Sequence, residues 1–100
     1  MTRKSILEAA SACVLGQRET RYGKPEDNFQ NIANLWNAYL DEKRFTSDDV
    51  AVMMILLKIA RLKGSNDIGN LDSWVDICGY AACGGEIFYN EKEKERMNNE

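Results

Sequence analysis

The apolar residues of this chain recur at intervals of three and four, which is the spacing of amphipathic helices. Four stretches follow the repeat, over residues 6–14, 29–40, 49–63 and 71–89, and none alternates with the period of two that strands need. The pattern therefore predicts an all-α fold, a four-helix bundle-like single domain over residues 1–90. The charged stretch over residues 91–100 has no apolar face, so we expect it to be a frayed helix end.

Local signals support the ends of these helices. Gly16 is placed to end the first helix in the left-handed conformation, and Pro25 can begin the second from its first turn. Thr46 is followed three residues later by Asp49, which is a capping signal for the start of the third helix. Short loops therefore connect the helices, apart from the longer segment 17–27.

The apolar stretches over residues 49–63 and 71–89 lead to further predictions. Residues 49–63 are apolar on nearly every side, so we expect this helix to be the most buried element, and Trp74 to belong to the core. A glycine inside a helix is unfavourable, so Gly79 indicates close contact with another helix. Gly84 and Gly85 together indicate a kink or a break.

Composition narrows the classes of function. A net charge of −3 argues against binding to a nucleic-acid polymer, which requires clustered Lys and Arg. The longest apolar run is too short to cross a bilayer, so we expect a cytoplasmic protein without membrane contact. The chain has no histidine, which excludes His-based nucleophile activation and His metal sites. Its three cysteines form no CxxC pair and are expected to be buried small hydrophobes.

Four charged residues lie in the two most apolar stretches. If residues 64–70 turn the fourth helix back along the third, Arg61 falls level with Asp72, and Lys58 with Asp76. Tyr80 continues the row of the two aspartates by another helical turn. One interpretation is a set of structural ion pairs that clamp the hairpin. The other is a site in which the carboxylates hold Mg²⁺ while Lys58 and Arg61 hold phosphate oxygens.

Two further candidates leave alternatives open. Asp49 is either a metal ligand or, as a first-turn acid, a partner of the helix dipole. In the loop before the second helix, Arg21 can form a forked contact with a phosphate and Tyr22 can stack on a ring. The same loop can also serve only to cap the second helix. No glycine-rich phosphate loop occurs, so any phosphate contact must come from side chains.

The runs around these residues resemble a family of small phage and prophage proteins of unassigned function. The resemblance spans about residues 6–86 and rests most clearly on RYGKPEDNF at residues 21–29 and DSWVDICGYAA at residues 72–82. More distantly, the pattern K-x-x-R followed by D-x-x-x-D-x-x-x-Y resembles the all-α nucleoside triphosphate pyrophosphohydrolases of the MazG-like and dUTPase-like superfamily.

That second resemblance implies a helical bundle, often dimeric or tetrameric, which holds a nucleotide and cleaves it between its α and β phosphates with Mg²⁺. It implies metal ligands at Asp49, Asp72 and Asp76, of which Asp72 and Asp76 are also the catalytic candidates. The phosphate contacts it suggests are Lys58 and Arg61. The full set of candidate nucleotide-binding and phosphate-binding residues is Lys58, Arg61, Arg21, Tyr22, Asn28 and Tyr80. The helix over residues 29–40 departs from the superfamily, because it carries asparagines where an E-E-x-x-E motif is expected.

Three hypotheses follow. The chain is a Mg²⁺-dependent nucleotide pyrophosphohydrolase, or a module that sequesters a nucleotide without cleaving it, or a helical inhibitor of a host protein. In each case the apolar surface of residues 49–63 predicts a homo-oligomer.

Overall fold

The computed structural model describes residues 1–16, 21 and 23–99 of the chain. In this part of the chain the secondary structure is entirely helical, as the sequence predicts. The helices are α1 (Arg3–Val14), α3 (Pro25–Leu40), α4 (Ser47–Gly64) and α5 (Leu71–Asn98), with the short 3₁₀ helix η1 (Ile68–Asn70) before α5. None of the helices in the described residues could cross a bilayer.

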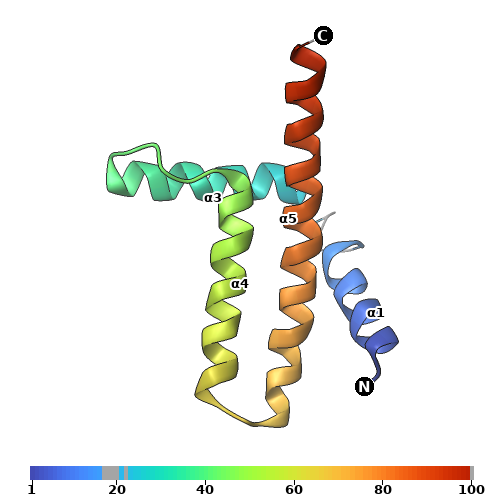
Figure 1. The fold of residues 1–100 in the computed structure, drawn as a ribbon. Coiled ribbons are helices and arrows are strands. Elements are labelled where there is room, and N and C mark those ends of the chain that lie inside the picture. The colour runs from blue at the N-terminus through green and yellow to red at the C-terminus, as the bar shows by residue number, and fades with distance from the viewer. Residues whose placement is uncertain (17–20, 22, 100) are drawn as a thin grey trace.

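Helices α4 and α5 form an antiparallel hairpin, and the other two helices pack against it (Figure 1). Helix α1 lies beside α5, whereas α3 lies across the hairpin close to the start of α4. The fold therefore differs from the expected bundle, in which all helices would run roughly alongside one another. Helix α3 is the helix that departs from that geometry (Figure 1).

The connection from α3 to α4 accounts for this change of direction. Asp41 adopts the left-handed conformation, with φ of 54°, and ends α3. The Asn37 side chain then holds the following loop: its amide donates to the Phe45 carbonyl at 2.9 Å, and its oxygen accepts from the Phe45 and Arg44 amides at 2.8 and 2.9 Å. The Asn37 side chain thus provides hydrogen-bond partners for three backbone groups of the loop, and it fixes the turn.

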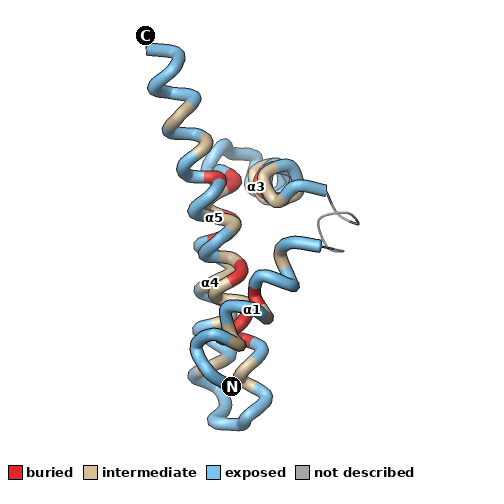
Figure 2. Tube along the Cα trace, turned by 90° about the vertical axis from the view of Figure 1, so that its right-hand side faces the viewer, coloured by how far each residue is buried: buried red, intermediate tan, exposed pale blue. Residues whose placement is uncertain are grey.

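The core sits where α3 crosses the hairpin. It consists of Phe29 and Ala33 from α3, Val50 and Ala51 from α4, and Ile87 from α5. Helix α4 supplies Ser47, Val50 and Ala51 to the buried part of the molecule, but it is not buried all round, because Val52 and Leu56 are 54% and 55% exposed. Trp74, expected in the core, is 54% exposed. The described helices pack on one side of the hairpin and leave the other uncovered (Figure 2).

The glycines of α5 allow close helix contacts. A Cβ atom added at Gly79 would lie 3.0 Å from Val14 Cγ1, which confirms the predicted contact, here with α1. A Cβ atom added at Gly84 would lie 2.8 Å from the Ala51 Cβ on α4. The predicted kink at Gly84 and Gly85 is wrong, because α5 continues unbroken through both.

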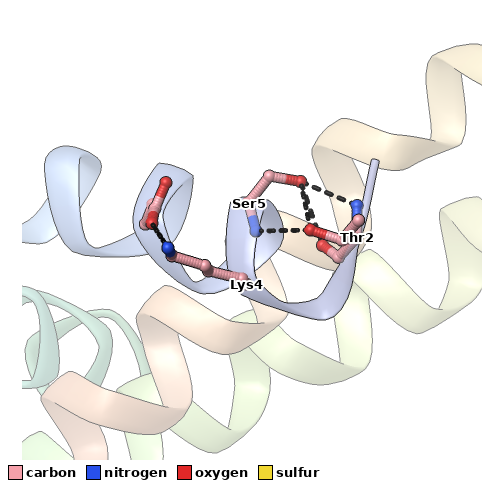
Figure 3. A network of polar contacts seen from close by, with 4 residues as sticks. Thr2, Lys4 and Ser5 are labelled. Atoms are coloured by element: carbon pink, nitrogen blue, oxygen red, sulfur yellow. Dashed lines mark hydrogen bonds and ion pairs between the residues drawn. The ribbon is translucent and has the colours of Figure 1, made fainter.

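Two helices extend beyond the apolar stretches of the sequence. Helix α5 continues past residue 90 to Asn98, and Lys94 Nζ lies 3.4 Å from Glu26 Oε1 on α3. At the other end, Thr2 and Ser5 form a capping box at the start of α1 (Figure 3). The Ser5 amide donates to Thr2 Oγ1 at 3.1 Å, and the Thr2 amide donates to Ser5 Oγ at 2.8 Å.

Candidate functional site

A cavity of about 250 Å³ lies among α1, α3, α4 and α5, on the side of the hairpin against which α1 and α3 pack. Every one of the four helices contributes to its wall. The residues that line it are Cys13, Val14, Gly23, Pro25, Asn28, Phe29, Lys58, Val75, Asp76, Gly79, Tyr80 and Cys83. The absence of a side chain at Gly79 lets α1 approach α5 and close this side of the cavity.

The polar part of the wall is an ion pair between the two helices of the hairpin. Lys58 Nζ lies 2.9 Å from Asp76 Oδ2, and the side chains are 13% and 36% exposed, respectively. This contact confirms the register predicted from the length of the turn. An ammonium group this far from water is expensive to leave unpaired, so Asp76 stabilises Lys58 in the folded state. The structural interpretation of this pair is therefore correct, and it does not exclude a role in binding.

The wall also has an aromatic part. The Phe29 and Tyr80 rings have their centroids 6.1 Å apart and are tilted by 34°. Asn28 precedes Phe29 on α3 and offers an amide donor and acceptor to the same cavity. The cavity thus combines aromatic side chains with hydrogen-bonding groups.

Four of the residues predicted from the sequence meet at this cavity: Asn28, Lys58, Asp76 and Tyr80. Arg61 and Asp72 do not line it, and both are exposed, one helical turn away from Lys58 and Asp76 along their own helices. The paired cluster of four charges is therefore reduced to one ion pair, with two charged neighbours outside the cavity.

Asp49 serves as a helix cap. Its Oδ2 atom accepts a hydrogen bond from the Thr46 amide at 3.0 Å, which is the second half of a capping box at the start of α4. Among the described residues, no three or more Cys, Asp or Glu side chains form a group that could hold a metal ion. The structure thus does not gather Asp49, Asp72 and Asp76 into one cluster.

The loop before α3 is only partly described. Arg21 is exposed and does not line the cavity, whereas Gly23 and Pro25 do. The prediction for Tyr22 lies outside the described residues.

Apart from Asn28, the sequence did not indicate the walls that α1 and α3 supply. Phe29 is 7% exposed and belongs to the apolar repeat of α3, which by itself predicts only burial. Cys83 continues the face of Asp76 and Tyr80 by one more turn, so the row of polar residues on α5 could have been extended to it. Cys13 carried no such signal, because its position depends on how α1 docks. Neither cysteine is fully buried, contrary to expectation.

The fold and the cavity define a small all-α protein with a partly polar pocket beside a helical hairpin. Residues 5–88 match the family described as Domain of unknown function (DUF6378), and the chain belongs to that family. No solved structure matches it.

Two relatives are both called Gene 55 protein. The one from Mycobacterium phage D29 is 45% identical over 92 residues, which are 92% of this chain and 59% of the relative. The one from Mycobacterium phage L5 is 49% identical over 77 residues, which are 77% of this chain and 48% of the relative. The chain thus spans only 48% to 59% of these relatives. They confirm the resemblance to phage proteins of unassigned function.

Proposed function

We propose that this protein binds a nucleotide in the cavity among its four helices, with the base beside Phe29 and Tyr80 and the phosphates at Lys58. The observation that carries the proposal is the meeting of an ammonium, a carboxylate, an amide and an aromatic pair on one cavity wall. Ligand sites typically combine apolar and aromatic side chains with a small number of placed polar groups.

The size of the cavity sets how such a ligand would lie. At about 250 Å³ it is smaller than the roughly 300 to 1,000 Å³ typical of sites for larger ligands. It therefore suits the base and leaves the phosphates to extend outward past Lys58. Arg61 lies exposed one helical turn further along α4, where it could contact the outer phosphates.

Because of Asp76, the proposed nucleotide binding should depend on divalent cations. A phosphate that approaches Lys58 also approaches the Asp76 carboxylate, which repels it. Asp76 would be the carboxylate ligand of a Mg²⁺ ion, whose charge would offset this repulsion, because Mg²⁺ commonly uses one or two carboxylates together with substrate phosphates. Binding should therefore be tighter with Mg²⁺ than without it.

The resemblance to the MazG-like pyrophosphohydrolases supports the choice of a nucleotide over other anions. It also raises hydrolysis as a second possibility, since Asp72 and Asp76 lie four residues apart on α5. Binding without turnover is the proposal that we favour. Helix α3 contributes Pro25, Asn28 and Phe29 to the cavity and no acid, and a neutral amide does little to activate a water molecule.

Isothermal titration calorimetry with a panel of ribo- and deoxynucleotides, with and without Mg²⁺, tests the proposal. We expect at least one nucleotide to bind with Mg²⁺. Lys58→Met keeps the length of the side chain and removes its charge, so it should weaken binding by roughly 10-fold to 100-fold. Lys43→Met is the matched control, because Lys43 is exposed and lies outside the cavity.

Product analysis of any bound nucleotide by ³¹P NMR separates the two possibilities. An unchanged nucleotide after prolonged incubation with Mg²⁺ supports the binding module. Release of pyrophosphate that Asp76→Asn abolishes would establish the hydrolase instead. Absence of binding by every nucleotide, or equal loss in Lys58→Met and Lys43→Met, contradicts the proposed site.

A further inference from the structure

One broad side of the α4–α5 hairpin carries no helix of the described chain. In Figure 2, α3 lies wholly on the other side. The hairpin nevertheless has large apolar side chains that are 41% to 55% exposed, where an ordinary surface would carry charges. These are Val52, Met53, Leu56, Leu57, Ile59, Trp74 and Phe88.

Helix α4 presents the centre of this uncovered face as one stripe. Asp48, Val52, Leu56, Ile59 and Lys63 follow one another at spacings of four, four, three and four residues, which places them in a line along the helix. The stripe begins with an acid in the first turn of α4, is apolar in the middle, and ends with a base in the last turn.

Helix α5 contributes a second line of exposed side chains to the same face. Trp74, Ala81 and Phe88 are exposed and lie at intervals of seven, which again places them in one line. The ion pair between Lys58 and Asp76 fixes the register of the hairpin, so Trp74 lies level with residues 59–60 of α4. The two lines thus run side by side and form a single apolar surface, here called the bare face.

We propose that the bare face is covered by a second copy of this chain, with the two α4 helices antiparallel about a two-fold axis at Leu56. Reversal of the α4 stripe sets Asp48 of each copy against Lys63 of the other, and Val52 against Ile59. Leu56 meets its own counterpart at the axis. A surface that is complementary to itself when turned around is the requirement for a two-fold interface.

The amount of apolar surface suits a dimer. Seven large side chains, each about half exposed, contribute on the order of 100 Å² each, so each copy would bury roughly 700 Å². A standard stable interface buries about 800 Å² on each side. The chain is also extended for its length: its radius of gyration is 15.2 Å, against about 13 Å for a compact domain of this size. A second hairpin on the bare face would supply the missing layer.

Sedimentation velocity of the full chain between 1 and 200 µM tests the proposal. We expect a dimer that Leu56→Glu dissociates, because two like charges would meet at the axis; the dissociation constant should rise roughly 100-fold or more. Leu35→Glu is the matched control, since Leu35 is 69% exposed and lies on α3, away from the bare face. It should leave the dimer intact, and far-UV circular dichroism should show both variants helical.

A charge exchange tests the antiparallel orientation. Lys63→Asp alone should weaken the dimer about 10-fold, because two acids then face each other at each end of the stripe. Adding Asp48→Lys restores opposite charges and should restore the affinity. A monomeric wild type, a dimer that Leu56→Glu leaves intact, or equal dissociation by Leu35→Glu overturns the interface. Failure of the double variant to recover overturns the antiparallel pairing.

Discussion

The neighbouring glycines of α5 allow a sharp test of how closely the two hairpin helices approach. Alanine in place of either glycine should improve the local helix by about 1 kcal/mol, because glycine is a poor helix residue. The structure predicts that the two variants nevertheless differ in stability, because their surroundings differ. A Cβ atom at Gly84 would lie 2.8 Å from the Ala51 Cβ, whereas a Cβ atom at Gly85 has no neighbour within 4 Å.

The magnitude follows from the position of Ala51. This residue is 1% exposed within the core, so a new methyl group can be accommodated only by moving α4 and α5 apart. Overpacking of this kind typically costs about 1 to 3 kcal/mol. Gly84→Ala should therefore be less stable than Gly85→Ala by about 1 to 3 kcal/mol, since the gain in helix propensity is common to both.

Urea unfolding followed by circular dichroism at 222 nm measures this difference. Both variants should be compared with the wild type at one protein concentration, because self-association also contributes to stability. We expect Gly85→Ala to be as stable as the wild type or more stable, and Gly84→Ala to be destabilised relative to it. A Gly84→Ala variant that equals Gly85→Ala would refute the close approach of α4 and α5 at Ala51.

Three further predictions concern the polar contacts. Asn37→Ala should lower stability by about 1 to 3 kcal/mol in urea unfolding, because it removes the side chain that holds the α3–α4 loop, whereas exposed Asn31→Ala should change little. Asp49→Ala should lower the free energy of unfolding by about 1 kcal/mol, because it removes the capping hydrogen bond. It should leave any nucleotide affinity unchanged. A loss of Mg²⁺-dependent affinity in that variant would restore Asp49 as a metal ligand. Lys94→Ala should cost at most about 0.5 kcal/mol, since its ion pair with α3 is exposed; a larger loss would mean that this contact anchors the end of α5.

The sequence predicted the features that depend only on helical geometry. The pairing of Lys58 with Asp76 followed from the length of one turn and the rise per residue, which are the same in any α-helix. The direction of α3 could not be predicted in this way. Periodicity identifies its apolar face, but the crossing depends on the Asn37 side chain and the left-handed Asp41. The cavity depends on that crossing, so only part of its wall was found.

The apolar surface of α4 leads to two predictions, burial within the chain and self-association. Apolar residues around a whole helix indicate that something covers them, which is either the same chain or a second copy. In the structure Val50 and Ala51 lie in the core, whereas Val52, Leu56 and Ile59 remain exposed. The periodicity of one chain cannot distinguish burial within the chain from burial between copies. The proposed dimer therefore rests on the part of the apolar pattern that the chain itself does not cover.

The cavity and the bare face occupy different sides of α4, so the two proposals do not compete. Lys58 follows Leu56 by two residues, which turns its side chain by about 200° around the helix axis. Lys58 and Asp76 line the cavity that α1 and α3 help to enclose, whereas Leu56 is exposed and does not line it. A dimer formed through the bare face would thus leave both cavities open to solvent. Leu56→Glu should accordingly dissociate the dimer without weakening nucleotide binding, and Lys58→Met should do the reverse; one variant that abolished both would show that the ligand site needs the second copy.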